Sequence, residues 1–267
     1  MNDKELRRAC ERELKYVKKA EREMQKKAME PHSPWKAILG GAIPERVHDS
    51  LQAAYAKAFE IIFENAVGVI ELTYNKSEIE KDFIIHNFAV DTKRSQDELK
   101  RIRRKAESSD FFNSIFTTVE GVGLGVLGIG LPDIVIFLGF ILKSVYETAI
   151  KYGYDYEKPE ERLFILKLMS ASVRRRDKWI EADMEIDEML SAYARGKGLP
   201  VPMWDDMQEQ IETTAEDFAM DMLVLKFIQG LPFVGVLGGM GNPVYYKKIL
   251  KYVRVKYYKR YLLEKMK

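Results

Sequence analysis

Apolar side chains recur along most of the chain at intervals of three and four residues, which is the spacing of one helix face. The first such pattern runs from Leu6 to Met24, with charged residues between its apolar members. A second, from Pro44 to Ile70, carries an apolar stripe wide enough for a core helix. No stretch alternates convincingly between apolar and polar residues as a strand would. The sequence therefore predicts an all-α fold, a multi-helix bundle.

Local signals predict where individual helices begin. Ser77-x-x-Glu80 and Ser95-x-x-Glu98 are capping-box patterns, and each predicts a helix start. The helix after Ser95 carries five basic residues within positions 100–105. We expect an amphipathic N-terminal helix in residues 1–30, followed by one helical domain in residues 44–267.

The second half of the chain contains further helices. Gly153 predicts the end of a helix that starts at Asp133, and Pro159 suits the first position of the next one. Residues 181–188 are acidic and predict a solvated helix face. The tail, residues 245–267, interleaves Lys and Arg with Tyr and predicts a basic, aromatic helix.

Two apolar segments rich in glycine and proline interrupt the helical pattern, at residues 115–142 and 230–243. Each glycine lowers helix stability by about 1 kcal/mol relative to alanine, so we expect the missing side chains to allow close backbone contact. Proline then breaks the helix. Each segment therefore predicts a helical hairpin, whose key residues are Gly121, Gly125, Gly128 and Pro132 in the first, and Gly235 and Gly239 in the second.

These hairpins have two interpretations, and the sequence leaves both open. Each half is shorter than the roughly 20 apolar residues of a membrane-spanning helix. The hairpins are either buried within the bundle or re-entrant, dipping into one leaflet of a bilayer. Glu120, Asp133 and Asn242 are the candidate functional polar residues in these segments, although Asp133 also suits a helix cap and Glu120 an exposed helix end.

Composition places the protein in a reducing environment. The chain has 267 residues, one cysteine (Cys10) and a net charge of only +2, and its N-terminus lacks the apolar core of a signal peptide. The cations are bunched, however, next to the apolar segments, as a membrane surface with anionic headgroups would select. The candidate basic interface consists of Arg101, Arg104, Lys248, Lys251 and Arg254. A net charge so near neutral argues against a nucleic-acid partner.

No motif indicates a reaction. Gly123-x-Gly125-x-x-Gly128 matches a dinucleotide fingerprint, but Pro132 would cut its helix short. Glu45-x-x-His48 is half of a di-iron signature whose second half is missing from the sequence. Walker, HExxH and GxSxG motifs are also missing. We therefore predict no catalytic residue, no metal site and no cofactor.

Three sequence features together resemble the EcsC family. They are the glycine run into Leu131-Pro-Asp133, the Tyr152-Gly-Tyr154 turn followed by Pro159-Glu-Glu-Arg162, and the Pro232-x-x-Gly235…Gly239…Asn242 element before a basic tail. The likeness spans roughly Pro44 to the C-terminus. It implies a helical, membrane-associated protein without established catalytic residues or cofactor. The founding member of the family is encoded beside two components of an ABC transporter.

Two hypotheses follow. The first is a non-enzymatic protein, peripheral or monotopic on the cytoplasmic side of the cell membrane, that supports an ABC transporter or another membrane complex and contacts anionic lipids. The alternative is a lipid-binding or apolar-ligand-binding protein, with hydrolysis of the ligand left open, in which the glycine faces line a cavity and Asp133 lies near its mouth.

Overall fold

The computed structural model describes residues 3–30, 45–63, 67–107, 132–228 and 243–267, and the protein is helical, without strands, in these ranges. The all-α prediction is confirmed. The helices are α1 (Asp3–Ala28), α3 (Glu45–Ile61), α4 (Val67–Glu71), α5 (Lys76–Lys93), α6 (Gln96–Glu107), α8 (Pro132–Lys151), α9 (Pro159–Val173), α10 (Arg176–Ala194), α11 (Trp204–Ile228) and α12 (Pro243–Lys265).

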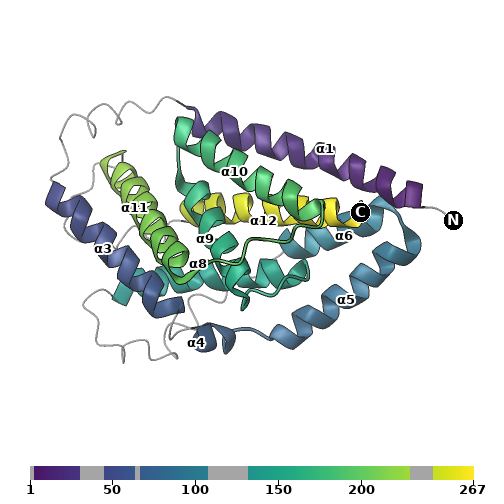
Figure 1. Cartoon of the computed structure of the whole chain (residues 1–267), viewed down its shortest axis with the longest axis horizontal. Coiled ribbons are helices and arrows are strands. Elements are labelled where there is room, and N and C mark those ends of the chain that lie inside the picture. The colour runs from purple at the N-terminus through teal and green to yellow at the C-terminus, as the bar shows by residue number, and fades with distance from the viewer. Residues whose placement is uncertain (1–2, 31–44, 64–66, 108–131, 229–242) are drawn as a thin grey trace.

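The last helix, α12, lies at the centre of the bundle. It packs against α1, α6, α8, α9 and α10, so it meets elements from both ends of the chain (Figure 1). At one end of the molecule α3 packs against α11 and α8, and at the other α5 packs against α6 and α8. The core therefore surrounds the segment that the sequence marks as basic and aromatic.

Tyrosine hydroxyl groups connect α12 to four other helices. The hydroxyl group of a buried tyrosine usually finds a hydrogen-bond partner. The four hydrogen bonds are Tyr252 to Asp183 of α10 (2.8 Å), Tyr257 to Glu161 of α9 (2.6 Å), Tyr258 to Glu13 of α1 (2.9 Å) and Tyr261 to Asn87 of α5 (2.9 Å). The tail is therefore rich in tyrosine because each face of α12 meets a different polar group.

Lys256 of α12 also points into the bundle, whereas Lys247 and Lys251 are exposed. Lys256 is fully buried, and its ammonium group lies 2.7–2.8 Å from carboxylate oxygens of Glu21, Asp183 and Asp187. Burial alone would lower the pKa of Lys256, but the three carboxylates reverse this and raise it. The prediction that residues 181–188 form a solvated face was therefore wrong at Asp183 and Asp187, because helical periodicity does not reveal which neighbour a face meets.

Several predicted helix ends are confirmed. Helix α8 ends at Lys151, and Gly153 follows with a φ of +82°. Helix α9 begins at Pro159, and the hydroxyl of Ser95 accepts a hydrogen bond from the backbone N–H of Glu98 at 3.4 Å. These signals act within one turn of the chain, so the sequence contains them in full.

One predicted cap lies two residues away from the real one. Helix α5 begins at Lys76, and the side chain of Asn75 accepts from the backbone N–H of Glu78 at 3.2 Å. Ser77 therefore lies inside the helix. Asn and Ser are equally good caps, and here the earlier residue takes the position. The stripe predicted up to Ile70 is divided between α3 and α4, with residues 64–66 outside the description.

The structure does not describe residues 108–131 and 229–242, which contain most of the two glycine-rich segments. Gly121, Gly125, Gly128, Gly235, Gly239, Glu120 and Asn242 are therefore not placed. Pro132 and Asp133 are the first two residues of α8. Within the described helices, none combines the length and the apolar character needed to span a bilayer.

Candidate functional site

A cationic groove runs between α1, α6 and α12 and has a volume of about 480 Å³. Below, the term "cationic groove" means the space lined by Tyr16 of α1, Glu107 of α6, and Tyr246, Lys247, Leu250, Lys251, Arg254 and Val255 of α12. Residues 247, 251 and 254 share one side of α12 because they are separated by three and four positions. The helical period therefore gathers three cations that look scattered in the sequence.

The described lining of the cationic groove contains more cations than carboxylates. Its carboxylate among the described residues, Glu107, accepts hydrogen bonds from the hydroxyl of Tyr16 at 3.1 Å and from Arg103 at 3.2 Å. The Arg103 guanidinium lies over the Tyr16 ring at 3.9 Å. Lys247, Lys251 and Arg254 give the groove a basic character that suits an anion.

The groove cations differ in exposure. The Lys251 side chain is 46% exposed and lies 3.3 Å from the carboxylate of Glu23, while Lys247 is exposed. Arg254 is half-buried, and burial lowers the pKa of its guanidinium below the usual value. An arginine remains charged in proteins nevertheless. The groove thus places one partly desolvated charge beside two more exposed ones.

The groove also lies where both glycine-rich segments join the bundle. Glu107, in its wall, is the last described residue before segment 108–131. Tyr246 and Lys247 follow closely after segment 229–242. The hydroxyl groups of Tyr246 and Ser144 of α8 form a hydrogen bond, which ties the start of α12 to α8. The groove therefore lies next to two of the points at which the described part of the chain ends.

The candidate basic interface divides into three parts in the structure. Lys251 and Arg254 share the cationic groove, and Arg101 and Arg104 lie exposed on α6. Lys248 instead donates to the carboxylate of Asp221 at 2.9 Å, inside the bundle.

Burial lowers the pKa of Lys248, although Asp221 opposes the shift. Arg175 binds the other oxygen of the same carboxylate at 2.7 Å. Lys248 therefore belongs to an ion-pair network that holds α11 and α12 together rather than to the groove.

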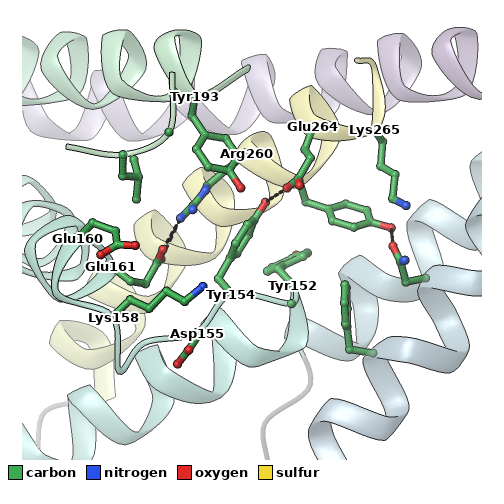
Figure 2. Close-up of a pocket in the computed structure, with 16 residues that line it drawn as sticks. Tyr152, Tyr154, Asp155, Lys158, Glu160, Glu161, Tyr193, Arg260, Glu264 and Lys265 are labelled. Atoms are coloured by element: carbon green, nitrogen blue, oxygen red, sulfur yellow. Dashed lines mark hydrogen bonds and ion pairs between the residues drawn. The ribbon is translucent and has the colours of Figure 1, made fainter. Parts of the chain in front are cut away.

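A second cavity, of about 560 Å³, lies between the α8–α9 turn, α5, α10 and α12. Arg260 is at its centre and is 4% exposed. Figure 2 shows its guanidinium between the rings of Tyr154 and Tyr193, at 3.8 and 4.3 Å from their centroids. One of its nitrogens donates to both oxygens of Glu161, at 2.9 and 2.7 Å. We call this arrangement the arginine clamp.

The arginine clamp gathers two of the motifs singled out in the sequence, Tyr152-Gly-Tyr154 and Pro159-Glu-Glu-Arg162. The hydroxyl of Tyr154 donates to Glu264 at 3.0 Å. Burial alone would lower the pKa of Arg260, but the Glu161 carboxylate raises it, so the arginine stays charged. The clamp groups bond mainly to one another, which fits a role in holding α12 against α9 and α10.

The comparison with family models decides the classification. The model of the EcsC protein family matches residues 11–262, almost the whole chain. The chain belongs to the EcsC protein family.

The EcsC match begins within α1, earlier than the resemblance from Pro44 onward had suggested. No curated protein and no solved structure matches the chain. The family assignment therefore rests on the match over residues 11–262. Residues 152–154 and 160–161, which come from one of the three features that resemble the family, line the cavity of the arginine clamp.

Sequence reasoning missed two residues of the cationic groove, Tyr16 and Glu107. Neither is unusual in its local sequence, and their groove partners on α12 are more than 130 positions away. It also missed the pairing of Glu161 with Arg260. The only available signal was that Glu161 belongs to an EcsC motif, which marks the residue without naming its partner.

Proposed function

We propose that the protein is a non-enzymatic, peripheral membrane protein that binds anionic phospholipid headgroups on the cytoplasmic side of the cell membrane. The observation that carries the proposal is the cationic groove, where Lys247, Lys251 and Arg254 face a carboxylate already bound by Arg103. Basic side chains near an anionic leaflet contribute about 1 kcal/mol each. Tyr246 and Tyr16 supply the aromatic groups that membrane interfaces favour.

A second surface supports membrane contact. Helix α5 exposes Ile84, Ile85 and Phe88 at 63%, 63% and 70%, next to α6 with its exposed Arg101 and Arg104. Large apolar side chains that are neighbours on a surface often mark an interaction site. An apolar row beside cations favours the boundary between headgroups and acyl chains.

The proposed role is to support a membrane complex such as an ABC transporter. The family resemblance supports this part, because the founding member is encoded beside transporter components. Mass spectrometry of proteins that copurify with the tagged chain from native membranes tests it. Recovery without any transporter subunit would argue against this partner while leaving lipid binding untouched.

Flotation with vesicles tests the lipid proposal. We expect the protein to float with vesicles that contain phosphatidylserine, but not with pure phosphatidylcholine, and we expect added salt to release it. The double variant Lys247→Ala/Lys251→Ala should bind roughly 30-fold more weakly, since each lysine contributes about 1 kcal/mol. These lysines are exposed, so the fold should tolerate the change.

The matched control is Lys178→Ala/Lys197→Ala, which removes the same charge from exposed positions outside the groove. It should float like the wild type, apart from a small effect of net charge. Equal losses in the two double variants would show that net charge alone drives binding and would refute a role for the groove. Absence of flotation at low salt would refute lipid binding altogether.

A further inference from the structure

A third cavity, of about 290 Å³, lies where the first turns of α9 and α11 meet the end of α3. We call it the Arg162 groove. Its walls are mainly apolar and include Phe63, Met203, Trp204, Met207 and Ile211. Its volume is at the lower end of the range of about 300–1,000 Å³ typical of ligand pockets.

Arg162 brings a charge into these apolar walls. Its Nε is buried without a hydrogen-bond partner in the described part of the chain. The Nε of Arg260 is also without a partner, but another nitrogen of Arg260 binds Glu161, and Arg174 and Arg175 bind Asp217 and Asp221. A desolvated donor without a partner is unfavourable, typically by about 1–3 kcal/mol.

The carboxylate in the groove does not neutralise Arg162. Glu60 lines the same cavity, but its carboxylate bonds to Lys57, one helical turn away, at 2.9 Å. The groove therefore combines an apolar wall with a guanidinium whose planar edge suits a bidentate carboxylate.

The mouth of the groove is unusually apolar for a protein surface. Met203 and Trp204 are 71% and 68% exposed, and both lie where the loop after α10 leads into α11. Methionine is flexible and polarisable, and it is common at surfaces that adapt to apolar ligands. A chain of methylene groups would cover these side chains.

From this combination we infer that the Arg162 groove binds a small amphiphilic carboxylate, such as a medium-chain fatty acid. The carboxylate accepts hydrogen bonds from Arg162, and the chain lies against Met203, Trp204 and Met207. The site is separate from the cationic groove, which gathers three cations and suits a phosphate headgroup instead. A single guanidinium among apolar walls matches one carboxylate with an apolar tail.

Calorimetric titration of the full chain with decanoate and with decanol tests the inference. Both probes have the same chain length, so their difference isolates the carboxylate. We expect decanoate to bind at least roughly tenfold more tightly, because hydrogen bonds to charged groups are strong. Arg162→Met should abolish this preference. Arg104→Met, at an exposed arginine of α6 outside the groove, should retain it.

A second variant covers the case in which Arg162→Met does not fold. Met203→Glu places a negative charge at the exposed mouth and should weaken decanoate binding at least fivefold through repulsion. The control is Met184→Glu on α10, which is 58% exposed outside the groove and should leave binding unchanged.

Three results would overturn the inference. They are equal affinity for decanoate and decanol, unchanged decanoate affinity in both Arg162→Met and Met203→Glu, and binding of an apolar peptide with a free C-terminus but not of decanoate.

The variant Lys247→Ala/Lys251→Ala should still bind decanoate. This separates a failure of the cationic groove from a failure of the Arg162 groove.

Discussion

Gly153 shows most directly how one residue determines the local fold. Its φ of +82° is in the left-handed region, and a Cβ atom placed there would lie 2.3 Å from the ring of Phe83. Alanine would suffer both the backbone penalty, about 1–2 kcal/mol, and the cost of displacing a packed ring. We expect Gly153→Ala to lower the free energy of unfolding by roughly 2–4 kcal/mol in urea titrations.

Gly196 provides the control for Gly153. Its φ of +83° is almost the same, but no atom lies within 4 Å of the position of its Cβ. Gly196→Ala should therefore show the backbone penalty alone, roughly 1–2 kcal/mol. Equal losses at the two positions would show that Phe83 moves aside without cost, which would remove it as the reason for the glycine.

At the scale of elements, acid should loosen the contact between α1, α10 and α12. The contact contains Glu21, Asp183, Asp187, Lys256 and Lys259, and the ammonium groups of both lysines lie 2.7 Å from carboxylate oxygens of Asp187. Burial would raise the pKa of Asp187, but the two lysines lower it below its ordinary value of 3.8. The stabilisation from Asp187 is therefore present above about pH 4 and is lost as the pH falls through the folded pKa.

Cys10 reports this loosening. It is buried in α1, and burial raises the pKa of its thiol to about 11, so it should be inert in the folded protein. Dithiodipyridine, which reacts with thiols in acid, should modify Cys10 increasingly fast below about pH 4. The variant Asp187→Asn should show a flatter increase. An identical pH profile in the two proteins would contradict a role for Asp187.

The elements also show what the sequence could predict. Pro159, Gly153 and Ser95 set helix ends through contacts within one turn, and these ends were predicted correctly. The environment of α12 could not be predicted, because Lys256 finds its partners 69 and more positions away. A basic, aromatic helix has the same sequence pattern whether its charges face lipid or carboxylates.

For the same reason, the candidate sites could be predicted only in part. The sequence singled out Lys251 and Arg254, since bunched cations are visible in one dimension. It did not predict the Arg162 groove, because the apolar walls around Arg162 and the buried Nε of its side chain become visible only in the folded structure.

At the scale of the molecule, α12 joins the first helices to the last ones. Tyr258 and Lys256 bind Glu13 and Glu21 of α1, more than 230 positions away in the chain. The same helix bonds to α5, α9, α10 and α11 through other side chains. Such a centre should make unfolding cooperative, because none of the helices α1, α5, α9, α10 and α11 can detach without breaking a hydrogen bond to α12.

Replacing Lys256 by methionine tests this cooperativity. The change leaves Glu21, Asp183 and Asp187 facing Lys259 as the remaining cation of the cluster. Removing one partner of a buried ion pair typically lowers stability by about 3–5 kcal/mol, and we expect a loss in that range in urea.

The control for Lys256→Met is Lys167→Met. The partner of Lys167, Glu185, is 52% exposed, so the free energy of unfolding should fall by less than about 1 kcal/mol.

In Lys256→Met, helical circular dichroism and the reactivity of Cys10 should change in one shared transition as the urea concentration rises. If Cys10 reacts well before helicity falls, α1 detaches alone and α12 does not hold the molecule together as one unit. If both signals instead change together, at a lower urea concentration than in the wild type, the charges buried along α12 stabilise the helices around it as one unit.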